Sequence, residues 1–206
     1  MFQSSISALE LEKLPLESFG GKIEVIDHVG LQYARALAYL AKQKIVGFDT
    51  ETRPSFDAHH YHHDVALLQL SGPDRAYLFR LNKMGLRKSL CGILSNPQII
   101  KVGAATYDDV RGLQRLCKFK AGGFVDLQKM VWEWGIVDKS VKKMTAIILG
   151  FRISKSQQLS NWECDELTSA QRAYAATDAW VCRNMYIKLM DSEKNPLNEQ
   201  GNIKER

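Results

Sequence analysis

Residues 45–52, IVGFDTET, form an apolar run that ends in two acids two positions apart, Asp49 and Glu51. Side chains on a β-strand alternate between its two faces, so both carboxylates would point to the same side of a sheet. The residues on each face of this strand begin with apolar side chains, which predicts a central strand covered on both sides. Two like charges on one face repel each other, so the segment requires a nearby positive charge, most simply a divalent cation.

The apolar periodicity of the remaining chain predicts an α/β fold with a mixed sheet. Further strands are expected at residues 22–26, 65–70, 75–79, 98–102 and 124–126. The turn at residues 71–74 predicts an antiparallel hairpin. Helices are expected at residues 29–43, 85–95, 106–118, 127–135, 141–149 and about 168–190. Thr168 with Gln171 indicates a capping box for the last helix, and Gly150 indicates the end of the one before it.

The 206 residues predict a single domain at 22–190, preceded by an arm at 1–21 and followed by a polar tail at 191–206. No secretory leader is visible, and no apolar stretch approaches the roughly 20 residues that span a bilayer, so no membrane partner is expected. Four scattered cysteines without a CxxC pair predict free thiols in a reducing cytoplasm. Protein partners are not indicated.

A net charge of +5 favours a polyanionic partner, particularly if the acids are concentrated in one site. Asp108 and Asp109 lie at a predicted strand-to-helix junction. Asp109 shares a helical face with Leu113 and Leu116, which predicts that it points along the sheet side, while Asp108 faces outward. Asp109 is therefore the better candidate ligand, and Asp108 is the better partner for the helix dipole.

Tyr174 and Asp178 are four residues apart, so they share one face of the last helix with apolar residues. A carboxylate on the core side of a helix requires a partner. The histidine-rich tract at residues 59–63 resembles a transition-metal site, but it is more simply a polar surface loop, because its histidines cannot all reach one ion.

Each acid alone would be explained more simply as a helix cap or an ion-pair partner. Together they end a central strand, open a helix after the next core strand and lie on the inner face of the last helix. These positions can converge at one sheet edge. Carboxylates without cysteine or histidine ligands favour hard cations, Mg²⁺ or Mn²⁺.

Three segments resemble the exonuclease motifs of the DEDD superfamily. They are Phe48-Asp-Thr-Glu51, Lys101-Val-Gly followed by Asp109, and Tyr174-Ala-Ala-Thr-Asp178. The tyrosine four residues before the last acid resembles the DEDDy branch, whereas the histidine branch would carry histidine at the position of Ala173. Residues 159–179 are also similar to ribonuclease D and to the Werner-syndrome exonuclease domain.

The resemblance implies a ribonuclease H-like three-layer fold, with a mixed central sheet flanked by helices. It also implies removal of 3′-terminal nucleotides as 5′-monophosphates, with two divalent cations, Mg²⁺ or Mn²⁺, as cofactors. By this resemblance Asp49 would bridge both ions, and Glu51 and Asp178 would hold the ion that binds the attacking water. Asp109 would support the second ion, and Tyr174 would orient the nucleophilic water.

The expected partner is a nucleic acid with a single-stranded 3′ end. Backbone groups of Thr50 would contact the terminal nucleotide, and Arg53 and Phe56 would contact or stack on the strand. An equally good interpretation makes Phe56 a loop anchor packed on the core. Ribonuclease D carries helical nucleic-acid-binding domains after its nuclease domain, and none is expected here, which favours DNA over RNA.

Three alternatives remain open on the sequence. The first is a ribonuclease D-like exoribonuclease. The second is a catalytically silent nucleic-acid-binding module on the same fold. The third is hydrolysis of a small nucleotide substrate. No motif distinguishes a deoxyribose from a ribose at the 3′ end.

Overall fold

The computed structural model describes residues 1–55 and 63–196, and the core of this part of the chain is a mixed sheet of six strands. The strands are β1 (Lys22–Ile26), β2 (Ile45–Thr52), β3 (Val65–Ser71), β4 (Arg75–Arg80), β5 (Ile100–Gly103) and β6 (Phe124–Asp126). Their order in the sheet is β1-β4-β3-β2-β5-β6. Only β3 is antiparallel to its neighbours. The predicted hairpin and the interior position of β2 are confirmed.

Helices connect the strands and cover the sheet. They are α1 (Ala8–Lys13), α2 (Leu31–Leu40), α3 (Leu81–Met84), α4 (Lys88–Ser95), α5 (Thr106–Leu116), α6 (Leu127–Met130), the 3₁₀ helix η1 (Val131–Trp134), α7 (Val141–Leu149) and α8 (Ser169–Met190). The single helix predicted at 127–135 was wrong, because an α-helical turn passes into a 3₁₀ turn that Gly135 ends at φ 79°. The helix predicted at 85–95 starts later, at Lys88, and α3 was not predicted.

The ends of the last two helices follow the sequence signals. The Thr168 hydroxyl accepts from the Gln171 backbone N–H at 3.1 Å, and the Gln171 side chain accepts from the Thr168 N–H at 2.9 Å. This capping box starts α8 as predicted. Gly150, at φ 80°, ends α7 as predicted, because a left-handed residue is favourable for glycine.

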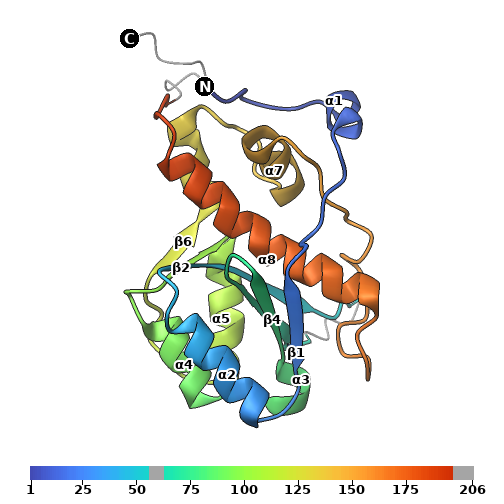
Figure 1. The fold of residues 1–206 in the computed structure, drawn as a ribbon, viewed down its shortest axis with the longest axis vertical. Helices are drawn as coiled ribbons and strands as arrows, with labels where there is room; N and C mark the ends of the chain where they lie inside the picture. Colours follow the sequence, from blue (N-terminus) through green and yellow to red (C-terminus); the bar gives the residue numbers. More distant parts are fainter. Residues whose placement is uncertain (56–62, 197–206) are drawn as a thin grey trace.

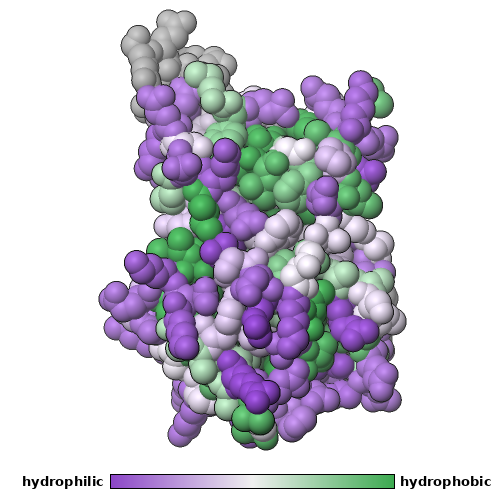
Figure 2. Space-filling view, viewed as in Figure 1, coloured by the Kyte–Doolittle hydropathy of each residue, from purple (hydrophilic) through white to green (hydrophobic). Residues whose placement is uncertain are grey.

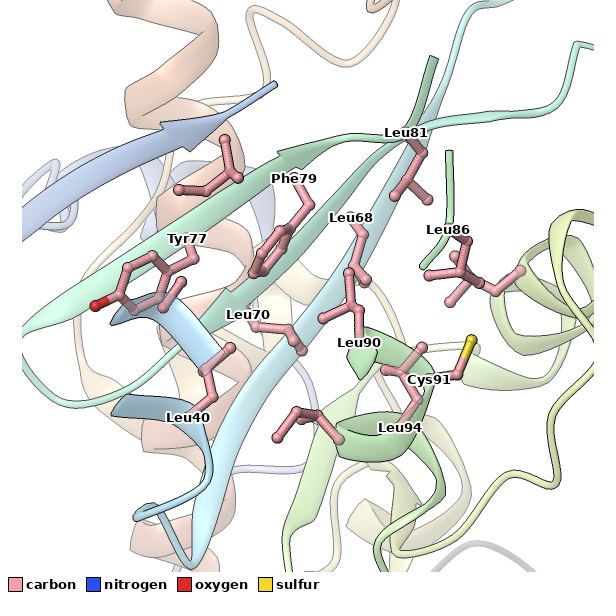
Figure 3. Packing of buried hydrophobic residues seen from close by; sticks show 14 of the residues in the cluster. Leu40, Leu68, Leu70, Tyr77, Phe79, Leu81, Leu86, Leu90, Cys91 and Leu94 are labelled. Carbon is pink, nitrogen blue, oxygen red and sulfur yellow. The ribbon is translucent and has the colours of Figure 1, made fainter. Parts of the chain in front are cut away.

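The sheet lies between two helical layers (Figure 1). Helices α2, α4 and α5 cover one face, where the core includes Leu40, Leu68, Leu70, Phe79 and Leu90 (Figure 3). On the other face α8 lies diagonally across the strands and α7 packs beside it (Figure 1). The α/β fold with a mixed sheet flanked by helices is therefore confirmed.

The segment before β1 packs against the α7 and α8 layer. Its helix α1 begins with a capping box of Ser7 and Glu10, a signal that the sequence prediction missed. The Phe19 N–H donates to Thr177 on α8 at 3.0 Å, and the Arg152 N–H donates to Pro15 at 2.9 Å. Figure 2 shows hydrophobic side chains gathered over α7 and hydrophilic ones over α2. Within the described residues, no helix is both long and apolar enough to cross a membrane.

Candidate active site

Three carboxylates from distant parts of the chain meet on the α8 face of the sheet. Asp49 and Glu51 point to this face from β2, because residues two apart on a strand share a side. Asp178 approaches them from α8, which packs across β2. One ligand oxygen from each of the three lies within 4.8 Å of the others. This spacing allows all three to bind the same ion.

Burial and mutual repulsion disfavour the ionised forms of these acids. Burial raises the pKa of Asp49 well above its usual range, and the charges of Glu51 and Asp178 raise it further. Burial also raises the pKa of Glu51 to about 9. Burial raises the pKa of Asp178 to about 7, although a hydrogen bond with Tyr174 and the charge of Lys155 act in the opposite direction. Bound cations would favour the ionised forms instead.

The chemistry of the donors fits hard divalent cations. Within residues 1–55 and 63–196, none of the three carboxylates forms an ion pair with lysine or arginine at 4.0 Å or less. Burial raises the pKa of the Cys182 thiol, one turn from Asp178, so this thiol stays protonated and is a poor ligand. Oxygen donors without thiolate suit Mg²⁺ or Mn²⁺.

Asp109 lies beside the group of three carboxylates. Its carboxylate accepts a hydrogen bond from the Thr50 hydroxyl at 2.5 Å. Burial raises the pKa of Asp109 to about 6, against this hydrogen bond. Asp108 is exposed on the same helical turn, so the two aspartates face different surroundings, as their helical positions predict. The Thr50 hydroxyl therefore orients Asp109. The predicted contact of Thr50 with the terminal nucleotide uses its backbone groups, which this hydrogen bond leaves available.

The residue before α5 has an unusual backbone conformation. Ala105 has left-handed backbone angles, φ 57° and ψ 34°, immediately before the helix. This conformation costs an L-residue about 1–2 kcal/mol. The Asp126 carboxylate accepts from the Ala105 N–H at 2.9 Å and from the Gln128 N–H at 3.1 Å. The Asp126 carboxylate therefore fixes the entry to α5 and the start of α6 together.

Tyr174 stands one helical turn from Asp178 and shares a hydrogen bond with its carboxylate. Its ring packs on Trp162, with ring centroids 6.0 Å apart. Trp162 is fully buried, so it limits the positions that the Tyr174 ring can take. Burial and the charge of Asp178 raise the pKa of Tyr174 above its ordinary value near 10, so its hydroxyl keeps its proton at neutral pH.

The acids form one wall of a cleft of about 300 Å³. The cleft is lined by Asp49, Thr50, Glu51, Ser140, Val141, Lys142, Ile153, Ser154, Lys155, Gln158, Tyr174 and Asp178. The rest of the lining comes from the start of α7 and from the loop before α8, and it includes Lys142 and Lys155. No local pattern in the sequence distinguishes these two lysines from the other lysines of the chain. A cleft lined by both carboxylates and lysines suits a phosphodiester held between cations and lysines.

The remaining candidates from the sequence lie elsewhere. Arg53 does not line the cleft; its guanidinium pairs with Glu163 at 3.4 Å. His63, the last residue of the histidine tract, contacts the same carboxylate at 3.0 Å. Phe56 and residues 59–62 lie outside the described residues.

Known 3′–5′ exonucleases are similar to this chain in sequence. A family model described as 3′–5′ exonuclease matches residues 31–192. Ribonuclease D of Gluconacetobacter diazotrophicus is 27% identical over 154 residues, which cover 74% of this chain and 38% of that protein. The bifunctional 3′–5′ exonuclease/ATP-dependent helicase WRN of Mus musculus is 30% identical over 161 residues, which cover 73% of this chain and 11% of that protein. The chain thus spans less than half the length of either relative.

The fold also matches a solved structure. The crystal structure of the Nibbler EXO domain of Aedes aegypti superposes with a TM-score of 0.75 at 21% sequence identity. The match covers 85% of this chain and 91% of that domain. At this level of identity the match shows the fold, which is ribonuclease H-like.

Proposed function

Since the chain belongs to the 3′–5′ exonuclease family, we propose that it removes nucleotides from the 3′ end of a single-stranded nucleic acid as 5′-monophosphates. The observation that carries this proposal is the convergence of Asp49, Glu51 and Asp178 within 4.8 Å of one another. The activity is assigned to the predicted domain at residues 22–190, with the arm at 1–21 as a support and 191–206 as a tail.

In this proposal two divalent cations, Mg²⁺ or Mn²⁺, would activate the attacking water and stabilise the leaving 3′-oxygen when bound. Asp49, Glu51 and Asp178 would hold the cations. Asp109, oriented by the Thr50 hydroxyl, would support the second cation. The Tyr174 hydroxyl would hydrogen-bond the attacking water next to Glu51. A hydroxyl that keeps its proton at neutral pH orients water and is not the base.

The substrate would lie in the cleft between the acids and the lysines. Lys142 and Lys155 would pair with its phosphates, and the Thr50 backbone would contact the terminal nucleotide. Arg53 and Phe56 are also proposed to contact the nucleic-acid strand. DNA is the proposed polymer and RNA the alternative, and the name of one relative, ribonuclease D, favours the alternative.

A cytoplasmic location is also proposed. The four cysteines are scattered along the sequence without a CxxC pair, a pattern that is usual for proteins of a reducing compartment.

The function can be tested with matched DNA and RNA oligonucleotides labelled at either end, incubated with Mn²⁺, with Mg²⁺ or with EDTA. We expect 5′-labelled strands to shorten stepwise and 3′-labelled strands to release mononucleotides, in the presence of metal only. Asp49→Ala should abolish both signals while leaving the circular dichroism spectrum unchanged, because it removes a ligand and no core packing. Absence of metal-dependent shortening from the 3′ end on either polymer would contradict the proposal.

A further inference from the structure

Two cations lie close to an exposed aromatic ring beside the candidate active site. Tyr107, on the first turn of α5, is 60% exposed. The Arg111 guanidinium, one turn along the same helix, lies 5.6 Å from the centroid of the Tyr107 ring. The Lys129 ammonium, from α6, lies 5.8 Å from the same centroid. Two separate helices therefore place positive charge around one accessible ring.

A second exposed ring extends this surface. Trp132 on η1 is 51% exposed, and its indole N–H donates to the Lys129 carbonyl at 3.0 Å. Within residues 1–55 and 63–196, neither Arg111 nor Lys129 forms an ion pair with a carboxylate at 4.0 Å or less. Exposed rings interleaved with unpaired cations are what sequence-tolerant binding of a single strand requires, since bases stack and phosphates pair.

This surface is structurally continuous with the cleft. Tyr107 is two residues from Asp109, and the shared cap on Asp126 joins the start of α5 to the start of α6. From α6, the Gln128 side chain donates to the Lys139 carbonyl at 3.0 Å, and the next residue, Ser140, lines the cleft.

The β-strands that lead into the candidate site and into this surface are near neighbours in the sheet. β6, which leads into α6, is two positions from β2 in the sheet order. At about 4.8 Å per strand the separation is roughly 10 Å.

We propose that Tyr107, Arg111, Lys129 and Trp132 form a binding surface for the nucleotides on the 5′ side of the scissile bond. This inference rests on the proposed function, which assigns the 3′ end to the cleft and so sets the direction of the bound strand. Bases would stack on the two rings, and the backbone phosphates would pair with the two cations. Asp108 adjoins this surface and lowers its charge without reversing it.

The test compares two double variants of the full chain. Tyr107→Ala/Arg111→Ala removes a ring and a cation four residues apart on α5. Leu31→Ala/Arg35→Ala is the matched control on α2, where Leu31 is 67% exposed and Arg35 is exposed. Both variants remove one positive charge and one large exposed side chain, so net charge and exposed area change alike.

Binding is measured by fluorescence anisotropy in EDTA, with single-stranded DNA and RNA of about 12 nucleotides. We expect the α5 double variant to bind at least about tenfold more weakly than wild type, and the control to stay within about twofold. The slope of log affinity against log salt should fall by about 0.7 for one lost phosphate contact. Tyr107→Phe should bind like wild type, because stacking is retained.

Turnover with Mn²⁺ separates this inference from the proposed function. We expect the α5 double variant to raise KM for the longer strand, with a smaller loss for a dinucleotide, which offers only one nucleotide to the surface. A wild-type protein that binds strands through this surface without hydrolysing them would contradict the exonuclease proposal alone. Equal binding and salt slopes for the two double variants would overturn the proposed surface, whether or not the protein is active.

Discussion

Gly47 on β2 lies directly against the backbone of Ala179 on α8. A β-carbon at position 47 would stand 1.7 Å from the Ala179 carbonyl oxygen, far inside van der Waals contact. The helix can approach the strand this closely only because glycine has no side chain. Ala179 follows Asp178, and Gly47 is two residues from Asp49 on the same strand face, so this crossing brings the carboxylates together.

Gly47→Ala should therefore disrupt both stability and the site. The added methyl group meets backbone, which cannot rotate away, and we expect a loss of about 3 kcal/mol in the free energy of unfolding, measured by urea denaturation. Gly92→Ala on α4 is the control, because nothing lies within 4 Å of its β-carbon position. That change should stabilise the protein by up to about 1 kcal/mol through helix propensity. Equal effects of the two changes would contradict the close crossing.

Tyr174→Phe should lower kcat while preserving metal binding. The phenyl ring keeps its packing on Trp162, but the hydroxyl that would orient water is lost. We expect kcat to fall about 10²-fold with little change in the Mn²⁺ concentration needed for half-maximal activity. Tyr186→Phe, three turns along α8, is the control and should leave kcat unchanged. A Tyr174→Phe enzyme with wild-type kcat would remove the hydroxyl from the mechanism.

Asp178→Asn should stabilise the metal-free protein and abolish its response to metal. The change removes one of three mutually repelling carboxylates, so the melting temperature in EDTA should rise, with a gain on the order of 1 kcal/mol. Added Mn²⁺ should raise the melting temperature of wild type but not of this variant. Asp165→Asn, at an exposed position, should behave like wild type in both conditions. Full metal stabilisation of Asp178→Asn would exclude this carboxylate as a ligand.

The metal-free protein should lose stability as the pH rises. The pKa is raised to about 6 for Asp109, about 7 for Asp178 and about 9 for Glu51, whereas unfolded carboxyl groups titrate near 4. The folded state therefore holds more protons than the unfolded state above pH 4. The stability linked to these protons is complete below the unfolded pKa and is lost as the pH rises through each folded pKa.

Urea denaturation in EDTA between pH 5 and pH 7.5 measures this loss. We expect about 1.4 kcal/mol less stability per pH unit for each extra proton that the folded state holds. Saturating Mn²⁺ should flatten the slope, because metal replaces protons at the carboxylates. Above this range Lys101 acts in the opposite direction, since burial lowers its pKa to about 8. A free energy of unfolding in EDTA that stays constant or rises with pH would contradict the raised pKa values.

Much of the fold could be predicted because its signals are local. Alternating apolar residues define β2, and the turn between β3 and β4 defines the hairpin. Paired hydrogen bonds between Thr168 and Gln171 start α8 where the capping pattern places them. The errors occurred where local signals are weak or compete, as at residues 127–135, where a short helix tightens into a 3₁₀ turn.

The acids of the candidate site could be predicted from the sequence, but the lysines that line the same cleft could not. The acids carry a pattern of spacing, because Asp49 and Glu51 share a strand face and Tyr174 and Asp178 share a helix face. Lys142 and Lys155 line the cleft, but neither has a distinguishing spacing. Arg53 was assigned to the substrate by position alone, and the structure pairs it with Glu163, which is 110 residues away.

The sequence by itself determined which residues share a face of one element and which chemistry they offer, because these depend on the periods of strands and helices. It determined carboxylate oxygens suited to hard cations and a tyrosine one turn from the last acid. Only the tertiary structure decided that Asp178 reaches Asp49, that two lysines line the same cleft as the acids, and that two cations lie close to Tyr107. Those relationships depend on how closely separate backbones pack, as Gly47 and Ala179 do, and no period along the chain encodes that distance.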